Sequence, residues 1–176
     1  MGVKNYLIEG VSGTGKTSVA TELERRGYHT VHGDRELAYK GDPQTGEPLD
    51  MTTYGGPVDV AFGHRHHVWD VGKVKHLIAD LSHPITFFCG GSRNFHQFID
   101  LFDGVFVLDV DRATLERRLA SRPADEFGGK PAERRLVMQM HATKEDIPYN
   151  THNATPIDAT APLSALVDVI LAHCGE

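Results

Sequence analysis

The sequence predicts an α/β fold in which a five-stranded parallel sheet lies between helices in a three-layer sandwich. Two observations predict it. Apolar runs typical of strands alternate with helical patterns along the chain. The first strand, the first helix and the second strand follow one another within about 30 residues, which makes a βαβ unit and a parallel start to the sheet.

A glycine-rich loop stands at the end of the first predicted strand. Residues 10–17 read Gly-Val-Ser-Gly-Thr-Gly-Lys-Thr and match the P-loop pattern G-x-x-x-x-G-K-[ST], after a strand-like run at residues 3–8. Glycines let successive backbone N–H groups face phosphate oxygens, and the following helix adds the positive end of its dipole. Lys16 would reach the β- and γ-phosphates, and the Thr17 hydroxyl would hold Mg²⁺. We expect a nucleotide to bind at Gly10, Ser12, Gly13, Thr14, Gly15, Lys16, Thr17 and Ser18.

The second strand is predicted at residues 28–32, and Asp34 follows it. Ligands of open α/β sheets bind outside the carboxyl ends of the strands. Asp34 could therefore hold Mg²⁺ through water or take the proton from an acceptor hydroxyl. The alternative is a structural role as a helix cap, because Asp-Arg-Glu-Leu is also a typical helix start.

A turn-rich segment follows. Residues 40–57 contain many Gly and Pro residues and predict a long loop, which in a compact domain is usually functional or mobile. Residues 58–81 show helical periodicity in their second half. We expect an acceptor-binding insert at about residues 35–80 of a single domain spanning residues 1–176.

This insert carries the run His64-Arg65-His66-His67-Val68-Trp69-Asp70. On a helix His64 and His67 would share a face, but no third metal ligand is evident. Two interpretations stay open. Arg65 and Trp69 line an acceptor pocket, or the run is a solvated polar face with Trp69 packed in the core.

The apolar run at residues 84–89 predicts a strand buried on both faces, followed by Gly90-Gly91-Ser92-Arg93-Asn94 and a short helix through Ile99. Glycines there allow a ligand close to the backbone. Arg93 and Asn94 would then bind anionic or hydroxyl groups of an acceptor. The alternative is a purely structural strand–helix turn.

The next strand is predicted at residues 104–110, and the helix after it carries Arg118 and Arg122 one turn apart on one face. Two cations on one face repel each other unless an anion such as triphosphate offsets them. The alternative is a solvated arginine-rich helix.

Two helices joined by a Gly-Gly loop, with Arg134 in the second, predict a hinged lid at about residues 123–135. A last strand at residues 154–158 and an amphipathic helix at residues 162–174 complete the predicted sheet.

Composition excludes several classes of partner. The net charge of −6 disfavours a nucleic-acid surface, and no segment reaches the roughly 20 apolar residues that cross a bilayer. Cys89 and Cys174 form no disulfide framework, and no signal-like stretch is seen, so we expect a cytoplasmic protein. We expect a monomer or a small homo-oligomer whose partners are a nucleotide and a small-molecule acceptor.

The P-loop, the stretch at residues 118–122 and the ending at residues 157–162 together resemble the nucleoside/nucleotide kinase group of P-loop proteins, which includes adenylate, shikimate and gluconate kinases. The pattern also resembles small bacterial ATP-binding proteins labelled AAA-family ATPases. The resemblance covers nearly the whole chain. It implies a P-loop NTP hydrolase fold with a mobile lid, and ATP and Mg²⁺ as cofactors.

The resemblance also implies roles for single residues. Arg118 would stack on the adenine of ATP, Arg122 would contact its phosphates, and Asp158 would border its base. Arg93 would meet an acceptor phosphate, and Gln97 falls where adenylate kinases read the acceptor base.

One position departs from the nucleotide-kinase pattern. Those kinases end the third strand with an Asp that holds the water shell of Mg²⁺, and this chain has Cys89 there. The Cys-Gly-Gly ending is closer to shikimate kinases, which also place an Asp where Asp34 stands. We therefore expect an ATP-dependent phosphotransferase for a small hydroxylated metabolite or a nucleoside, with Lys16, Asp34 and Arg122 as catalytic residues. The alternatives are a nucleoside monophosphate kinase and a non-catalytic ATP-binding switch.

Overall fold

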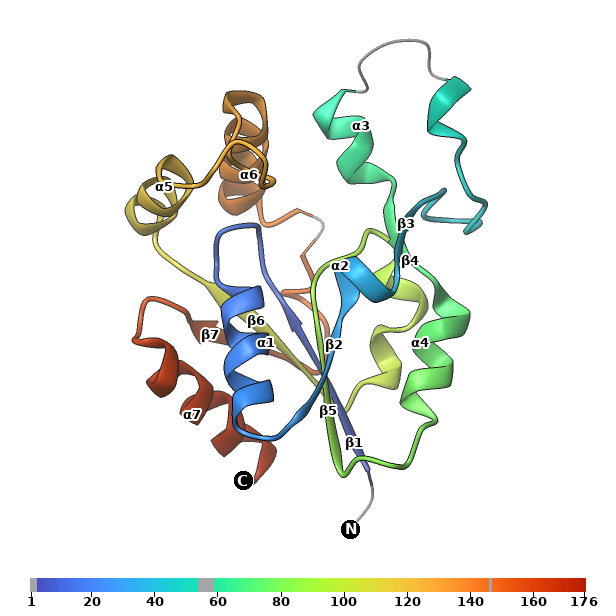
Figure 1. Cartoon of the computed structure of the whole chain (residues 1–176), viewed down its shortest axis with the longest axis vertical. Coiled ribbons are helices and arrows are strands. Elements are labelled where there is room, and N and C mark those ends of the chain that lie inside the picture. The colour runs from blue at the N-terminus through green and yellow to red at the C-terminus, as the bar shows by residue number, and fades with distance from the viewer. Residues whose placement is uncertain (1–2, 54–58, 146) are drawn as a thin grey trace.

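The computed structural model describes residues 3–53, 59–145 and 147–176. Its central sheet has five parallel strands in the order β2-β5-β1-β6-β7 (Figure 1). Their bounds are β1 Lys4–Glu9, β2 His29–His32, β5 Ile85–Cys89, β6 Gly104–Asp109 and β7 Ala154–Asp158. The predicted fold class and all five predicted strands are confirmed. The apolar runs of β1, β5 and β6 suit strands that are buried on both faces.

Helices cover both faces of the sheet (Figure 1). Helix α1 (Lys16–Arg25) packs against α7 (Leu163–Cys174) on one side, and α4 (Val71–Ile78) lies on the other. The core between these layers is apolar and includes Leu7, Phe87 and Leu108, each at most 1% exposed. Within the described residues, no helix combines the length and the apolar character needed to cross a membrane.

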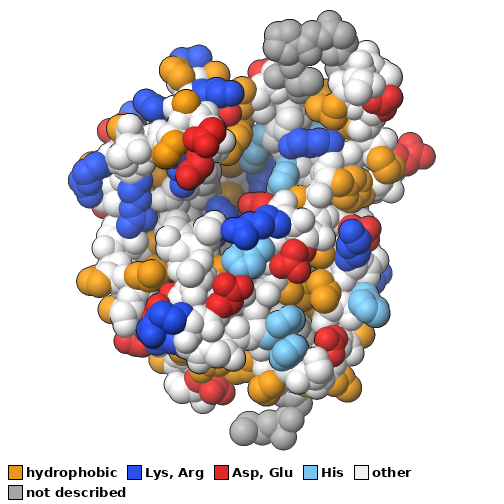
Figure 2. All heavy atoms as spheres, in the orientation of Figure 1, with side chains coloured by type: hydrophobic (Ala, Val, Ile, Leu, Met, Phe, Trp, Pro, Cys, Tyr) orange, Lys and Arg blue, Asp and Glu red, His pale blue; other side chains and the backbone are white. Residues whose placement is uncertain are grey.

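The segment predicted as a lid, at about residues 123–135, joins two helices above the carboxyl ends of the strands. Its movement as a lid stays a prediction, and the name is kept below for this segment and the two helices. Helix α5 (Arg112–Ala120) leads through residues 121–130 into α6 (Pro131–Thr143). Helix α6 contacts both α5 and α3, a helix of the insert, so the lid and the insert meet above the sheet. Figure 2 shows a hollow between them with Lys, Arg and His side chains around it.

The insert differs from the sequence prediction. It contains α2 (Gly33–Glu36), a 3-10 turn (Met51–Thr53) and α3 (Val60–Arg65). It also contains a two-stranded antiparallel sheet of β3 (Ala38–Lys40) and β4 (His67–Trp69). The predicted loop therefore begins inside a strand, and its residues 54–57, with Val58, lie outside the described residues.

The pairing of β3 with β4 also changes the histidine run. His64 lies on α3 and His67 on β4, opposite Lys40, so the condition under which they would share a helical face is not met. A pairing between residues almost 30 positions apart overrides the local helical periodicity here. The short helix expected through Ile99 is likewise two 3-10 turns, Phe95–Gln97 and Ile99–Leu101.

Candidate active site

The P-loop connects β1 to α1 with the geometry that phosphate binding requires. Gly13 and Gly15 adopt φ angles of +93° and +107°, a left-handed region that glycine enters without steric cost. The Thr14 hydroxyl donates to the Val11 carbonyl at 2.8 Å and closes the turn. The backbone N–H groups at the start of α1 carry no intrahelical partner, so they can bind an anion.

Lys16 folds back over this loop. Its ammonium donates to the carbonyl oxygens of Gly10 and Val11. Burial lowers the pKa of Lys16, while the nearby carboxylates of Glu9 and Asp34 act in the opposite direction. The ammonium therefore lies at the P-loop and near Asp34. Its predicted contact with the β- and γ-phosphates of a nucleotide stays a prediction.

Arg118 of α5 and Arg122, two residues beyond its last residue Ala120, both reach the P-loop. The helix predicted to run to about Arg122 is therefore shorter in the structure. Arg118 donates to the Ala159 carbonyl at 2.9 Å and to the Gly13 and Thr14 carbonyls at 3.3 Å. Arg122 donates to the Ser12 hydroxyl and to a lid carbonyl, each at 2.7 Å. The alternative of a solvated arginine face is thereby ruled out for these two side chains.

A cavity of about 390 Å³ opens on the α5 side of the P-loop. Its walls include the loop glycines and both arginines, and its far end is formed by the chain after β7. Asp158 does not line it: this exposed carboxylate accepts hydrogen bonds from the N–H and the hydroxyl of Thr160. Its predicted place beside the nucleotide base therefore stays a prediction.

A second cavity, of about 580 Å³, lies on the other side of the P-loop, between the insert and the lid. It brings together predicted and unpredicted residues from segments far apart in the sequence. Its described lining consists of Glu9, Gly10, Val11, Ser12, Lys16, Asp34, Lys40, Met51, Asp59, Val60, Gly63, His64, His67, Gly91, Arg93, Phe127, Glu133, Met140 and Ile147.

Asp34 stands where the two halves of the site meet. Its carboxylate is 3.0 Å from Nε2 of His67. Burial raises the pKa of Asp34, but the hydrogen bond from His67 and the charges of Lys16 and Arg93 outweigh it, so the pKa falls below its usual value. The side chain does not cap α2, whose cap is His32, so the alternative role as a helix cap is not what the structure shows.

A smaller hollow of about 40 Å³ places Asp34 beside Thr17 and Lys16. A hydroxyl and a carboxylate are the oxygen ligands that Mg²⁺ prefers, and Mg²⁺ commonly completes its shell with water and phosphate. The described residues contain no cluster of three or more His, Cys, Asp or Glu side chains that could hold a metal by themselves. This donor set suits Mg²⁺ carried by a nucleotide.

Cys89 also borders this hollow, at the strand end where nucleotide kinases carry an Asp. It is buried, and burial raises the pKa of its thiol. The thiol therefore stays protonated at neutral pH and offers no negative charge to a metal. Asp34 is left as the acidic group of the hollow, in keeping with the shikimate-kinase side of the resemblance.

Arg93 enters the 580 Å³ cavity from the loop after β5. One guanidinium nitrogen of Arg93 is 2.8 Å from Nε2 of His64. The backbone N–H of Arg93 donates to the His67 carbonyl at 2.8 Å. An arginine can only donate, so Nε2 of His64 accepts. Burial and the charge of Arg93 lower the pKa of His64 to about 3, which keeps the imidazole neutral.

Five predicted acceptor residues lie outside this cavity's described lining, and Arg65, Trp69 and Asn94 are three of them. Arg65 is exposed. Trp69 is 1% exposed and stacks on Phe98, which supports the core-packing alternative for it. Asn94 is fully buried, and its side-chain amide bonds the backbone N–H and carbonyl of Trp69 at 3.0 and 2.9 Å. Asn94 therefore fixes the insert to the sheet.

Two further predicted residues hold loops in place. Gln97 donates to the Pro43 carbonyl at 2.8 Å, which ties the insert loop to the segment after β5. Arg134 donates to the Gly128 and Gly129 carbonyls and closes the lid loop onto α6. Direct contact of either side chain with a substrate remains a prediction.

Sequence reasoning missed Glu9 and Lys40. Glu9 ends β1, is 1% exposed, and accepts a hydrogen bond from the Gly10 N–H at 2.9 Å. Burial raises its pKa to about 7 despite the opposing charges of Arg93 and Lys16. A signal existed for Glu9, because a charged residue directly after an apolar central strand lies at a ligand-binding edge. Lys40 offered none, because the β3–β4 pairing that places it was not predicted.

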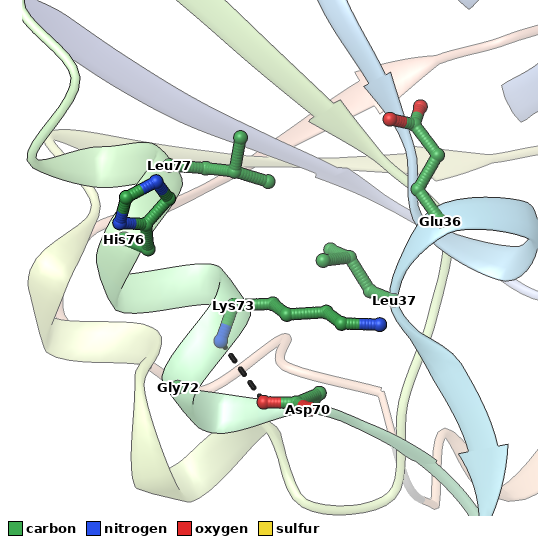
Figure 3. Close-up of a pocket in the computed structure, with 7 residues that line it drawn as sticks. All are labelled: Glu36, Leu37, Asp70, Gly72, Lys73, His76 and Leu77. Atoms are coloured by element: carbon green, nitrogen blue, oxygen red, sulfur yellow. Dashed lines mark hydrogen bonds between the residues drawn. The ribbon is translucent and has the colours of Figure 1, made fainter.

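A third hollow, of about 470 Å³, lies away from the P-loop, between α2 and α4 (Figure 3). Glu36, Leu37, Lys73 and Leu77 line it, and Asp70 beside them accepts the Lys73 backbone N–H at 2.9 Å as the cap of α4. None of the predicted site residues lines it, so we assign the candidate site to the two cavities that flank the P-loop.

Comparison with solved structures supports the assignment of the fold. The chain is similar to a gluconokinase from Sinorhizobium meliloti 1021 (18% identity, TM-score 0.55, 96% of this chain and 90% of that chain covered). It is also similar to a sugar kinase from Janibacter (17% identity, TM-score 0.58, 97% of this chain and 93% of that chain covered). A third similar structure is a shikimate kinase from Bacteroides thetaiotaomicron (13% identity, TM-score 0.60, 98% of this chain and 99% of that chain covered).

No protein-family model matches the chain, and no curated protein does either. At these identities the structural likeness defines the class of fold. The chain has the fold of the P-loop kinases, and the resemblance predicted from its motifs is confirmed at that level.

Proposed function

We propose that this protein is an ATP- and Mg²⁺-dependent phosphotransferase that moves the γ-phosphoryl group of ATP to a hydroxyl of a small metabolite or nucleoside. The observation that carries the proposal is the position of Asp34 and Lys16. Both lie at the boundary between the P-loop and the 580 Å³ cavity, where a γ-phosphate and an acceptor hydroxyl would meet.

The reaction forms a bond between the acceptor oxygen and the γ-phosphorus and breaks the bond from that phosphorus to the β,γ-bridging oxygen of ATP. The hydroxyl proton passes to Asp34, which His67 helps to hold ionised and oriented. Lys16, Arg122 and the P-loop N–H groups stabilise the charge on the transferring phosphoryl group. Thr17 and Asp34 would hold Mg²⁺, which neutralises phosphate charge when it is bound.

The test is ADP release from Mg·ATP with a panel of acceptors: sugar acids, shikimate-like polyols, nucleosides, nucleoside monophosphates and amino-alcohol antibiotics. We expect one class to stimulate ADP release. Lys16→Ala should lower that rate at least 10²- to 10³-fold, and Asp34→Asn by a similar factor with ATP affinity retained. Lys75→Ala and Asp100→Asn replace exposed residues elsewhere and serve as matched controls.

A Lys16→Ala variant with full transfer activity would disprove the proposal. Tight ATP binding with no turnover on any acceptor would favour the second candidate, a nucleotide-binding switch. The observation in favour of that candidate is Cys89, which is neutral where nucleotide kinases hold an acidic group. An ATP-dependent change in proteolysis of residues 121–130 would then support a switch with the lid as its reporter.

A further inference from the structure

The walls of the 580 Å³ cavity differ in chemistry from its floor. The floor is formed by the ends of the parallel strands and the P-loop, and it carries Glu9, Lys16, Asp34 and Arg93. The walls come from the insert and the lid. Apolar side chains face each other across them: Met51 and Val60 from the insert, and Phe127, Met140 and Ile147 from the lid and the chain after it.

The charged groups of the walls are already bonded to nearby backbone. The Lys40 ammonium donates to the Gly63 carbonyl at 2.7 Å. Asp59 caps α3, where it accepts the Ala61 N–H at 3.4 Å. One oxygen of Glu133 accepts the N–H groups of Gly128 and Lys130. What these walls offer a ligand is therefore chiefly their apolar surface.

The floor, in contrast, has unsatisfied hydrogen-bonding groups. Among the described residues, Oε2 of Glu9 and Nε of Arg93 are both buried without a hydrogen-bond partner. The Glu9 carboxylate is packed against the bare Cα of Gly91, where an added Cβ would lie 2.5 Å from Oε1. Both residues line the cavity, so its floor is polar and suits the hydroxyl-bearing end of a ligand.

A polyhydroxylated acid would fit this cavity poorly. Hydroxyls placed against Met51, Val60 or Met140 would lose their water without gaining hydrogen bonds, which costs free energy for each group. A hydrocarbon or aromatic body would instead remove the apolar walls from water. Phe127 is 42% exposed, so a ligand body packed against it would cover surface that now faces solvent.

Resting on the phosphotransferase function proposed above, we propose that the acceptor is amphipathic: its hydroxyl-bearing end lies on the polar floor, and an aromatic or hydrocarbon body lies between the insert and the lid. This class of acceptor separates the protein from kinases of sugar acids and of small polyols. Met51 and Met140 also favour an apolar ligand body, because the flexible thioether side chain adapts to apolar ligands of different shape.

The experiment uses pairs of acceptors that share their hydroxyl end and differ in the apolar group: octyl β-glucoside with methyl β-glucoside, a nucleoside with ribose, and 4-phenylbutane-1,2-diol with glycerol. We expect the apolar member of at least one pair to have a kcat/KM about 10²-fold higher. Equal values within every pair, or higher values for the polar members, would overturn the inference while leaving the phosphotransferase proposal intact.

Phe127→Gln should lower that preference, measured as the ratio of the two kcat/KM values within a pair, about tenfold by reducing the apolar wall. Leu101→Gln is the matched control, because Leu101 is similarly exposed, at 43%, and lies outside the cavity's described lining. A preference that survives Phe127→Gln unchanged would contradict the wall's role in recognition.

Calorimetric titration of the same pairs, with a non-hydrolysable ATP analogue present, tests the inference without turnover. Tighter binding of the apolar members supports an amphipathic ligand even if no phosphate is transferred, and in that case only the phosphotransferase proposal fails. Binding of the polar members alone, or of none, overturns the inference.

Discussion

The two sides of the P-loop are built in different ways. The side that we propose for the nucleotide centres on one contiguous motif, residues 10–18, which Arg118, Arg122 and the chain after β7 complete. The acceptor side is assembled from β1, the insert, the loop after β5 and the lid. A binding loop made by one contiguous motif has a geometry set by its own sequence. The geometry of a pocket formed by four segments depends on how those segments pack together.

This difference predicts how variants behave. A change on the nucleotide side should affect the reaction of every acceptor by the same factor, because all acceptors share one ATP. A change on the acceptor side should affect acceptors unequally and leave ATP binding in place. The following predictions test that separation.

The largest effect is expected at Arg122. Its guanidinium bonds the Ser12 hydroxyl of the P-loop, within reach of phosphate. Arg122→Met should lower kcat about 10²- to 10³-fold with every acceptor, because charge stabilisation of the transferring group is lost. Arg117→Met is the control, since Arg117 lies on the helix that precedes Arg122 and is exposed. Steady-state kinetics with two acceptors checks this; a loss confined to one acceptor would break the separation.

The second prediction concerns Glu9, which stands between the two sides. The pKa of a glutamate in the unfolded chain is near 4.5, whereas burial raises the pKa of Glu9 in the folded protein to about 7. The folded state thus binds the proton more tightly, so this group's contribution to stability is fully present below pH 4.5 and is lost as the pH rises through about 7. At pH 8 the difference amounts to at most about 3 kcal/mol.

Glu9→Gln removes this titration. Relative to the parent, the variant should gain up to about 3 kcal/mol of unfolding free energy between pH 5 and pH 8, measured by urea denaturation. Glu47→Gln, at an exposed position, should show no such change. A stability difference that is independent of pH would mean that Glu9 is not protonated by burial.

The sequence predicts the nucleotide side well for a physical reason. A P-loop needs its glycines at fixed spacing, and Arg118 and Arg122, four residues apart at the end of α5, both reach that loop. The central strands β1, β5 and β6 were also predictable, because a strand buried on both faces reads as a continuous apolar run. Asp34 followed from the rule that ligands bind at the carboxyl ends of such strands.

The insert resisted prediction because its structure comes from contacts distant in sequence. The chain leaves the helical path after Arg65 to pair residues 67–69 with residues 38–40. Asn94 looks like a ligand-binding residue from its place after a glycine pair, yet its amide bonds the backbone of Trp69. No local pattern distinguishes an amide that binds a ligand from one that binds a distant strand.

The third prediction uses that amide. Asn94→Leu keeps the approximate shape but leaves the buried N–H and carbonyl of Trp69 unpaired. We expect a loss of about 2 kcal/mol of unfolding free energy and a raised KM for the acceptor, with ATP affinity unchanged. Asn150→Leu, at an exposed position, is the control. An Asn94→Leu variant of full stability but without acceptor binding would instead restore the predicted direct role of Asn94.

The smallest effect is expected at Arg118. Its guanidinium bonds three backbone carbonyls beside the 390 Å³ cavity, and the kinase resemblance places the adenine there. Arg118→Met should weaken ATP binding about tenfold through the lost cation–π contact, while binding of inorganic triphosphate changes little. Arg112→Met, on the exposed side of α5, is the control.

Competition between ATP and triphosphate makes the Arg118 result specific. Equal weakening of both ligands would mean that Arg118 acts by holding the P-loop through the Gly13 and Thr14 carbonyls. Weakening of ATP alone would place the base in the cavity on the α5 side. Because the acceptor cavity lies on the opposite side of the loop, the acceptor KM should be the same in either case, and a change in it would show that the two sides are coupled.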